Sequence, residues 1–215
     1  MIREGRVSIA SRIVREPEHP TLETEADIRV DGQHFAKPVS RYLMLNKPRG
    51  LVTTTHDERS SDTVYRCFDD SDMGWIAPVG RLDKASEGLL LFSNDPQWAA
   101  RVTDPATGPS KTYHVQVCGI PDDAALHRMR QGVQDQGERL TAVSARMLRV
   151  GERNAWLEIV LGEGRNRQIR RILQALDFEV LRLVRVSIGR VALGELAKGA
   201  WRELSADEIA GLVGD

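Results

Sequence analysis

The segment VGRLDKASEGLLLFSND, residues 79–95, places one carboxylate, Asp83, in a short polar turn between two apolar stretches. Arg81 stands two residues before this carboxylate. A carboxylate can act as a nucleophile or as a general base, and a nearby arginine helps to keep it charged. The competing interpretation is an ordinary turn or capping residue, a common role for aspartate. The residue types of this segment alone leave both roles open.

A second chemically suggestive segment, residues 161–190, carries a local excess of positive charge. Its seven arginines and three acidic residues leave a net charge of +4. Guanidinium groups bind phosphate oxygens in pairs and stack on bases, and Gly162 and Gly164 let a ligand approach the backbone closely. Little acidic sequence lies at helical spacing from these arginines, but a solvated helix face remains the alternative. The charge pattern by itself does not decide between that face and an RNA contact.

The composition is that of a globular protein of 215 residues with a formal net charge of −1, so any basic surface must be local. Cys67 and Cys118 lie far apart and the five histidines are scattered, which predicts neither a disulfide framework nor a zinc site. The first residues lack the apolar run of a secretion signal, and no apolar run approaches the length of a membrane span. We therefore expect a cytoplasmic protein with no membrane partner.

Strands dominate the elements that must position these residues. Apolar or alternating runs predict strands within residues 42–45, 75–80, 88–94, 111–120, 155–164 and 179–191. Helices are predicted within residues 95–105, 121–133 and 166–178. We expect an α+β domain with a large mixed, mostly antiparallel β-sheet and flanking helices.

The ends and faces of these helices are marked by individual residues. Asp95 is the expected N-cap of the first helix, with Pro96 at its first position, and Gly132 is the expected C-terminal cap of the second. The third helix is amphipathic, with four apolar residues at helical spacing: Ile169, Ile172, Leu173 and Leu176.

Three segments together resemble, in order and spacing, the motifs of the pseudouridine synthase family. They are RYLMLNKPRGLVTT (41–54), VGRLDKASEGLLLFSND (79–95) and GEGRNRQIRRIL (162–173). The nearest branch acts on bacterial ribosomal RNA, and segments 110–121 and 181–204 look most like the enzymes called ribosomal large subunit pseudouridine synthase E. The resemblance implies that residues 39–215 form a catalytic domain with the pseudouridine synthase fold. It also implies an isomerase that uses no metal and no other cofactor.

Residues 1–38 are expected to form a separate, small β-rich segment. Valines and isoleucines alternate with polar residues on either side of a turn signal at Asp31-Gly32, and Pro38 is a candidate hinge. The segment resembles the second half of an S4 RNA-binding domain, without the helices that come first in that domain. The resemblance implies a truncated S4-like RNA-binding segment, and a plain β-rich extension is the alternative.

The family resemblance also implies roles for individual residues. Asp83 matches the reacting carboxylate, Arg170 the arginine that keeps it ionised, and Tyr113 the ring that stacks on uracil. Leu183 matches an apolar residue that closes the pocket. Tyr113 and Leu183 are each also compatible with an ordinary position on a half-buried strand. Further substrate contacts are expected from Lys47, Arg81, Arg165, Asn166, Arg167 and Gln168, with the cations contacting phosphate groups.

These expectations combine into one leading function and its alternatives. We expect isomerisation of a specific uridine to pseudouridine in ribosomal RNA, 23S more than 16S, either as free RNA or in a ribosomal assembly particle, by a monomeric enzyme. The target uridine would have to leave its base stack to reach Asp83. A non-catalytic RNA-binding ribosome-assembly factor is the alternative from another class, and 16S RNA is the alternative substrate. A hydrolase using Asp83 and His114 is weaker, because no oxyanion-binding motif accompanies this pair.

Overall fold

The computed structural model describes residues 1–21, 27–34, 39–54, 62–69 and 74–214 of the chain. The chain divides into two compact units, Met1–Val39 and Ser40–Asp215, which are described separately here. The candidate hinge at Pro38 lies outside the described residues.

The first unit is a small antiparallel sheet whose described strands run in the order β2-β1-β3-β4. These strands are β1 (Val7–Ile9), β2 (Arg12–Val14), β3 (Ile28–Val30) and β4 (Gln33–His34). Asp31 and Gly32 connect β3 to β4 with φ values of 52° and 80°. Two consecutive positive φ values are typical of a tight hairpin turn, so the turn predicted at this position is confirmed. The likeness of this unit to half of an S4 domain stays a prediction.

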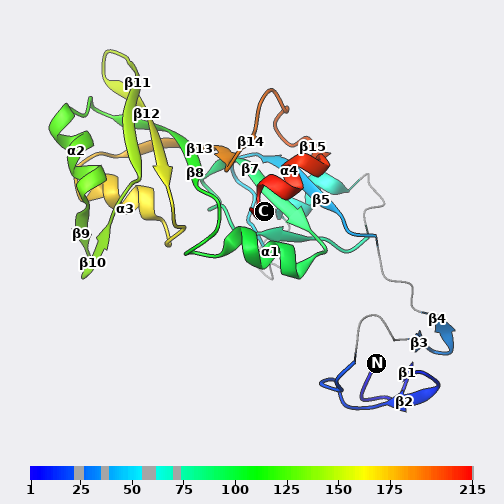
Figure 1. Ribbon diagram of the computed structural model, residues 1–215. Coiled ribbons are helices and arrows are strands. Elements are labelled where there is room, and N and C mark those ends of the chain that lie inside the picture. Colours follow the sequence, from blue (N-terminus) through cyan, green and yellow to red (C-terminus); the bar gives the residue numbers. More distant parts are fainter. Residues whose placement is uncertain (22–26, 35–38, 55–61, 70–73, 215) are drawn as a thin grey trace. The chain divides into compact units, whose positions relative to one another are not determined.

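The second unit is built on a sheet of nine strands within the described residues (Figure 1). They are β5 (Tyr42–Lys47), β6 (Ala77–Val79), β7 (Glu87–Ser93), β8 (Lys111–Cys118), β11 (Ser144–Val150), β12 (Asn154–Leu161), β13 (Val180–Ile188), β14 (Val191–Ala192) and β15 (Trp201–Glu203). The order is β11-β12-β8-β13-β7-β5-β15, with β6 paired to β7 and β14 paired to β13. The pair β13–β7 is parallel, and the other described pairs are antiparallel. The predicted mixed, mostly antiparallel sheet is thus confirmed.

Helices and one small hairpin flank this sheet. They are the 3₁₀ helix η1 (Val64–Phe68), α1 (Pro96–Thr103), α2 (Asp123–Gln131), α3 (Gln168–Gln174) and α4 (Ala206–Gly211), with the hairpin β9 (Val133–Asp135) and β10 (Glu138–Leu140). The Asp95 side chain accepts hydrogen bonds from the backbone N–H groups of Gln97 and Trp98, as its predicted N-cap role requires. Gly132 ends α2 with a φ of 106°. Both predicted caps are confirmed.

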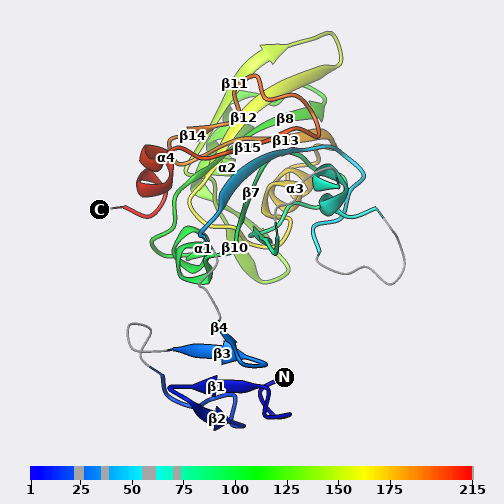
Figure 2. The same cartoon turned by 90° about the vertical axis from the view of Figure 1, so that its right-hand side faces the viewer.

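Strand β7 is the most deeply buried element, because side chains cover both of its faces. Leu90 and Phe92 belong to the hydrophobic cluster shared with η1, α2 and α3, whereas Leu89 and Leu91 belong to the cluster shared with α1 and α4. Figure 1 shows α1 and α4 in the same half of the sheet as β7 and β5, and Figure 2 shows α1 and α4 on one side of β7 and α3 on the other. Burial on two faces explains why β7 reads as a continuous apolar run rather than as an alternating one.

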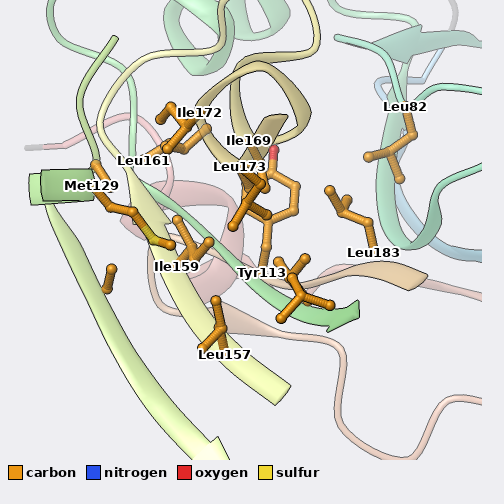
Figure 3. Packing of buried hydrophobic residues seen from close by; sticks show 14 of the residues in the cluster. Leu82, Tyr113, Met129, Leu157, Ile159, Leu161, Ile169, Ile172, Leu173 and Leu183 are labelled. Atoms are coloured by element: carbon orange, nitrogen blue, oxygen red, sulfur yellow. The ribbon is translucent and has the colours of Figure 1, made fainter. Parts of the chain in front are cut away.

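Strand β12 shows the opposite pattern, since every second residue from Ala155 to Leu161 is buried and the residues between are half-exposed. Its buried face packs against α2 and α3 through the cluster drawn in Figure 3. All four apolar residues of the predicted amphipathic helix are buried in that cluster, namely Ile169, Ile172, Leu173 and Leu176. Helix α3 is shorter than the predicted span of 166–178, because its regular part begins only at Gln168.

Candidate active site

A pocket of about 640 Å³ opens between the loop of residues 80–86, the start of α3 and the strands β8 and β13. Asp83, Tyr113, Arg170 and Leu183 all line it, although they lie far apart in the sequence. This volume is within the range of pockets that hold small organic ligands. The fold therefore brings together the four residues for which the sequence predicts the most specific roles.

The loop of residues 80–86, which we call the 80–86 loop, joins β6 to β7 and is held through its carbonyl groups. The Leu82 carbonyl accepts from Thr53 Oγ1 at 2.8 Å, the Lys84 carbonyl from the Gly50 N–H at 2.8 Å, and the Ala85 carbonyl from Arg170 Nη2 at 3.3 Å. Backbone groups held by partners from other segments lose their freedom to move. The position of Asp83 is thereby fixed before any ligand binds.

Lys47, at the end of β5, is the most deeply buried residue among those that bind the carbonyl groups of this loop. Its side chain is completely buried, and Nζ donates to the carbonyl oxygens of Pro48 at 3.1 Å, Asp83 at 3.2 Å and Ser86 at 2.9 Å. Burial lowers the pKa of Lys47 to about 8, against a smaller opposing effect of the Asp83 and Glu87 charges. The predicted contact between Lys47 and phosphate is wrong, because all three ammonium protons serve the backbone beneath the loop.

The Asp83 carboxylate faces two arginines of the α3 segment. Its Oδ2 atom lies 3.5 Å from Arg167 Nη1 and 3.9 Å from Arg170 Nε. The Asp83 side chain is 38% exposed whereas that of Arg170 is 16% exposed, so the arginine lies deeper than the carboxylate. Burial, and secondly the charge of Arg167, lower the pKa of Arg170, while the Asp83 charge opposes this shift. The pairing is loose enough to leave the carboxylate oxygens available to a ligand.

Arg167 adopts an unusual backbone conformation at the start of α3. Its φ is 49°, a left-handed value that costs energy for any residue with a Cβ atom, and its side chain makes no capping hydrogen bond. The same residue extends its guanidinium toward Asp83. Strained residues that persist in a fold are commonly found at functional sites, which agrees with a role for Arg167 at the pocket.

Tyr113 and Leu183 form the apolar side of the pocket on adjacent strands. Both are buried, and together with Ile169 of α3 they belong to one hydrophobic cluster (Figure 3). A flat ring and a branched aliphatic chain offer a surface on which a planar base can pack. The pocket therefore combines a charged part around Asp83 with an apolar part formed by Tyr113 and Leu183.

Comparisons with known proteins identify the family to which this fold belongs. The family model described as RNA pseudouridylate synthase matches residues 41–175. The chain belongs to this family. The predicted pseudouridine synthase fold is also confirmed by a solved structure named pseudouridylate synthase, with a TM-score of 0.72 and 31% identity over 99% of this chain and 90% of that one. An archaeal Nop10–Cbf5 complex shares the fold alone, with a TM-score of 0.54 and 17% identity over 73% of this chain and 50% of that one.

Curated relatives give the same family and show how much of them the chain spans. Ribosomal large subunit pseudouridine synthase B of Pasteurella multocida is 35% identical over 97% of this chain and 62% of its own length. An uncharacterized RNA pseudouridine synthase of Aquifex aeolicus is 36% identical over 99% of this chain and 85% of its own length. The chain thus spans about three fifths of the Pasteurella protein. These names do not specify the E type, so that finer assignment stays a prediction.

The loop before α3 has exposed residues that line the pocket and one buried residue that holds the loop in place. Arg165, Asn166 and Arg167 line the pocket and are exposed. Gln168 is 2% exposed, its Nε2 donates to the Thr141 carbonyl at 2.9 Å, and its Oε1 accepts from the Arg165 N–H at 3.2 Å. The predicted substrate contact of Gln168 is therefore corrected, because its amide is engaged in holding the loop.

The arginine-rich segment is less positive in space than in sequence. Arg171 forms ion pairs with Asp135 at 2.5 Å and with Glu138 at 2.7 Å, both from the β9–β10 hairpin. Arg182 pairs with Glu87 of β7 at 2.8 Å. The acids that compensate these arginines come from distant parts of the chain, which spacing along one helix cannot reveal. Arg165 also has an acidic partner, since its Nε lies 2.9 Å from Glu163. The pocket is lined by Arg81, Arg165, Arg167 and Arg170, together with two cations that were not among the predicted site residues.

Those two cations are Lys111 of β8 and Arg185 of β13. Each stands two residues from a predicted site residue on the same strand, Tyr113 and Leu183 respectively, and therefore faces the same side of the sheet. Lys111 and Arg185 could therefore have been found from the sequence, because alternate residues of a strand face the same side as Tyr113 and Leu183.

His114 lies on the opposite face of β8 from Tyr113 and does not line the pocket. Its Nε2 lies 3.5 Å from a carboxylate oxygen of Glu158 of β12. The predicted hydrolase pair of Asp83 and His114 is not assembled, since the sheet separates the two side chains.

Two further features are absent from the described residues. Among the residues that the structure describes, no helix is both long enough and apolar enough to cross a membrane. Within the same residues, no cluster of three or more histidine, cysteine or acidic side chains suits a metal ion.

Proposed function

We propose that this chain converts a specific uridine of ribosomal RNA into pseudouridine. The proposal rests on one observation above all: the Asp83 carboxylate is held in a pocket beside Arg167 and Arg170, with Tyr113 and Leu183 on the same pocket wall. Membership of the RNA pseudouridylate synthase family supports the reaction. The name of the relatives, ribosomal large subunit pseudouridine synthase B, favours 23S over 16S RNA as the substrate.

The reaction breaks the bond between ribose C1′ and uracil N1, turns the base and joins C1′ to C5. N1 gains a proton and C5 loses one, so the product is an isomer and no oxidant is consumed. Asp83 is the proposed reacting group, either as a nucleophile or as the base that removes a ribose proton. The residues leave these two routes open.

The neighbours of Asp83 have supporting roles in this proposal. Arg170 positions the carboxylate through the ion pair between Arg170 Nε and Asp83 Oδ2. Tyr113 packs on the uracil ring while the base is detached, and Leu183 closes the apolar side. A base held between apolar side chains is kept from water and from leaving the pocket.

The rim of the pocket would hold the RNA backbone. Arg81, Arg165, Asn166 and Arg167 are exposed there, and the cations among them are proposed to contact phosphates. Extrusion of the target uridine costs a few kcal/mol and least in an unpaired strand, which favours loops of the RNA. Action on an assembly particle, a monomeric state and a cytoplasmic location remain predictions that accompany this function.

The test is made in a strain from which the gene has been deleted. Pseudouridines are mapped across ribosomal RNA by carbodiimide-dependent primer extension after complementation with wild type, Asp83→Asn or the control Asp177→Asn, an exposed residue after α3. Wild type and Asp177→Asn should restore one modification, and Asp83→Asn should restore none. Equal modification by Asp83→Asn would refute the role of the carboxylate.

Folding of the variant must be measured alongside activity. Within the part of the chain that the structure describes, the Asp83 side chain forms a long hydrogen-bonded ion pair of 3.5 Å and an ion pair of 3.9 Å, so Asp83→Asn should change the free energy of unfolding by less than about 1 kcal/mol. An unfolded variant would support the turn-residue interpretation instead. Wild type that binds ribosomal RNA but modifies no uridine would support the alternative of a non-catalytic assembly factor.

A further inference from the structure

Lys111 and Arg185 bring two positive charges to the lining of the pocket, and neither takes part in the ion pairs that Asp83 forms within the described residues. Arg185 is only 6% exposed; its Nε donates to the Leu89 carbonyl at 2.7 Å, and its buried Nη2 atom has no hydrogen-bond partner among the described residues. Lys111 is half-buried and lines the same pocket. A buried guanidinium nitrogen without an acceptor is costly, so its presence in the fold requires an explanation.

The register of the sheet puts both cations on the pocket side. Arg185 of β13 stands directly opposite Tyr113 of β8, and Lys111 stands two residues before Tyr113 on the same strand. The backbone of Arg185 is fixed by its crossing with β7, where a Cβ atom on Gly88 would lie 2.3 Å from the Arg185 carbonyl oxygen. The guanidinium therefore starts from a rigid position next to the predicted uracil site.

Neither of these two positive charges is paired with a carboxylate of the described residues. Across the described parts of the chain, neither Lys111 nor Arg185 has a carboxylate within ion-pair distance, in contrast to Arg171 and Arg182. Burial, and secondly the charge of Arg185, lower the pKa of Lys111. Two like charges held together in a partly desolvated place destabilise the free protein and would be relieved by an anion.

We propose that Lys111 and Arg185 form a subsite for a phosphate group of the nucleotide whose base lies on Tyr113. The identity of that nucleotide as a uridine rests on the proposed function; the anion-binding pair rests on its own geometry. The phosphodiester is the anionic group of RNA, and a guanidinium and an ammonium are the side chains that bind it best. A phosphate held at this point would fix the ribose relative to Asp83.

Binding of small ligands to the full chain tests the subsite without any turnover. Uridine, uridine 3′-monophosphate, uridine 5′-monophosphate and inorganic phosphate are titrated into wild type, Lys111→Met and Arg185→Met, with NMR chemical shifts as the readout. Wild type should bind one monophosphate at least about tenfold more tightly than uridine, as expected for charge-assisted hydrogen bonds. Both variants should lose that preference and retain the affinity for uridine.

Arg128→Met is the control for the loss of one positive charge, because Arg128 is exposed on α2 and lies outside the pocket. It should keep the wild-type preference. Thermal unfolding provides a readout that a purely structural role would not give: Lys111→Met should unfold at the wild-type temperature or above it. Addition of the preferred monophosphate should raise the unfolding temperature of wild type and not that of Lys111→Met. If Arg185→Met does not fold, Lys111→Met alone carries the test.

Several outcomes would overturn the subsite. Equal affinities for uridine and both monophosphates would mean that the two cations do not contact a phosphate, but contact uracil oxygens or other groups of the protein. Inorganic phosphate bound as tightly as the nucleotides would assign the pair to a free anion. A preference that survives in Lys111→Met would remove this residue from the site. Failure of the proposed function is separate, because it would appear as missing pseudouridine in RNA while the preference for a monophosphate persists.

Discussion

Lys47 places an ammonium group beneath the 80–86 loop, where solvent does not reach it. Removing a cation from water is costly, and the three carbonyl oxygens around Nζ offset that cost by replacing water as acceptors. Two of these oxygens belong to Asp83 and Ser86, on either side of the loop's tightest turn. A single side chain thus connects the end of β5 to the backbone that carries the proposed reacting carboxylate.

The pKa of Lys47 makes this contact sensitive to alkaline conditions. In the folded chain the pKa is about 8, below the ordinary value of 10.5, so the unfolded chain binds this proton more tightly. The contribution of Lys47 to the free energy of unfolding should therefore rise with pH between about 8 and 10.5 and stay constant below that window.

An NMR titration that follows the Cε resonance of Lys47 measures this directly and should have its midpoint near 8. Urea unfolding of wild type and Lys47→Met at both ends of the window should show the same trend, with the difference between the two proteins changing with pH. A midpoint near the ordinary value of 10.5 would contradict the burial argument.

At the residue scale, local motifs carry the predictions for Asp83, Tyr113, Arg170 and Leu183, and the fold places these four residues in one pocket. The burial of Lys47 could not be predicted, because nothing in the polar turn around it indicates complete burial. The burial of such a side chain is decided by strands that arrive from other parts of the chain.

The parallel crossing of β13 and β7 is the tightest point between elements of the sheet. Gly88 has a φ of 100°, and a Cβ atom there would approach the Arg185 carbonyl oxygen to 2.3 Å. Both facts require glycine, since other residues avoid this conformation and backbone atoms cannot move aside. Through this crossing, β7 and the 80–86 loop before it are held in place against the strand that carries Leu183 and Arg185.

Gly88→Ala should therefore lower the free energy of unfolding by more than about 3 kcal/mol, from backbone strain and the clash together. Gly164→Ala is the matched control, because a Cβ atom there meets nothing within 4 Å. It should change stability by less than about 0.5 kcal/mol. Urea unfolding followed by circular dichroism compares the two variants, and similar midpoints would show that β13 can shift away from β7.

Long elements with a regular pattern were predictable, and short ones were not. Strands β8 and β12 alternate over eight residues each and were found from that alternation. The hairpin β9–β10, strand β15 and helix α4 were missed, since three to six residues do not establish a period. The β9–β10 hairpin is held against α3 through the ion pairs of Arg171, which no local pattern can signal.

At the scale of the whole molecule, stability resides in the second unit. Both of the large buried clusters described above consist of residues from Tyr42 onward. The first unit, Met1–Val39, has short strands and few buried side chains. A small unit buries little apolar surface. We therefore expect the first unit to contribute little to the free energy of unfolding of the second.

Deletion of residues 1–39 should leave the thermal unfolding temperature of the remaining chain unchanged. If the first unit is the S4-like RNA-binding segment that its sequence resembles, affinity for ribosomal RNA should fall by roughly tenfold, because linked modules reinforce each other's binding. Differential scanning calorimetry and filter binding to ribosomal RNA fragments measure the two effects. Unchanged affinity would favour a plain β-rich extension, and a lower unfolding temperature would show that the two units stabilise each other.

The way the 80–86 loop is anchored has a consequence for protein engineering. Its carbonyl groups from Leu82 to Ser86 are all bound by residues outside the hairpin or across its own turn, whereas the side chains of Arg81 and Lys84 are exposed. The backbone conformation of the loop is therefore set by the residues that bind its carbonyl groups and not by the exposed side chains of Arg81 and Lys84. A library randomised at these two positions should keep Asp83 in place, so the proposed RNA contacts of the loop can be varied without moving the proposed reacting carboxylate.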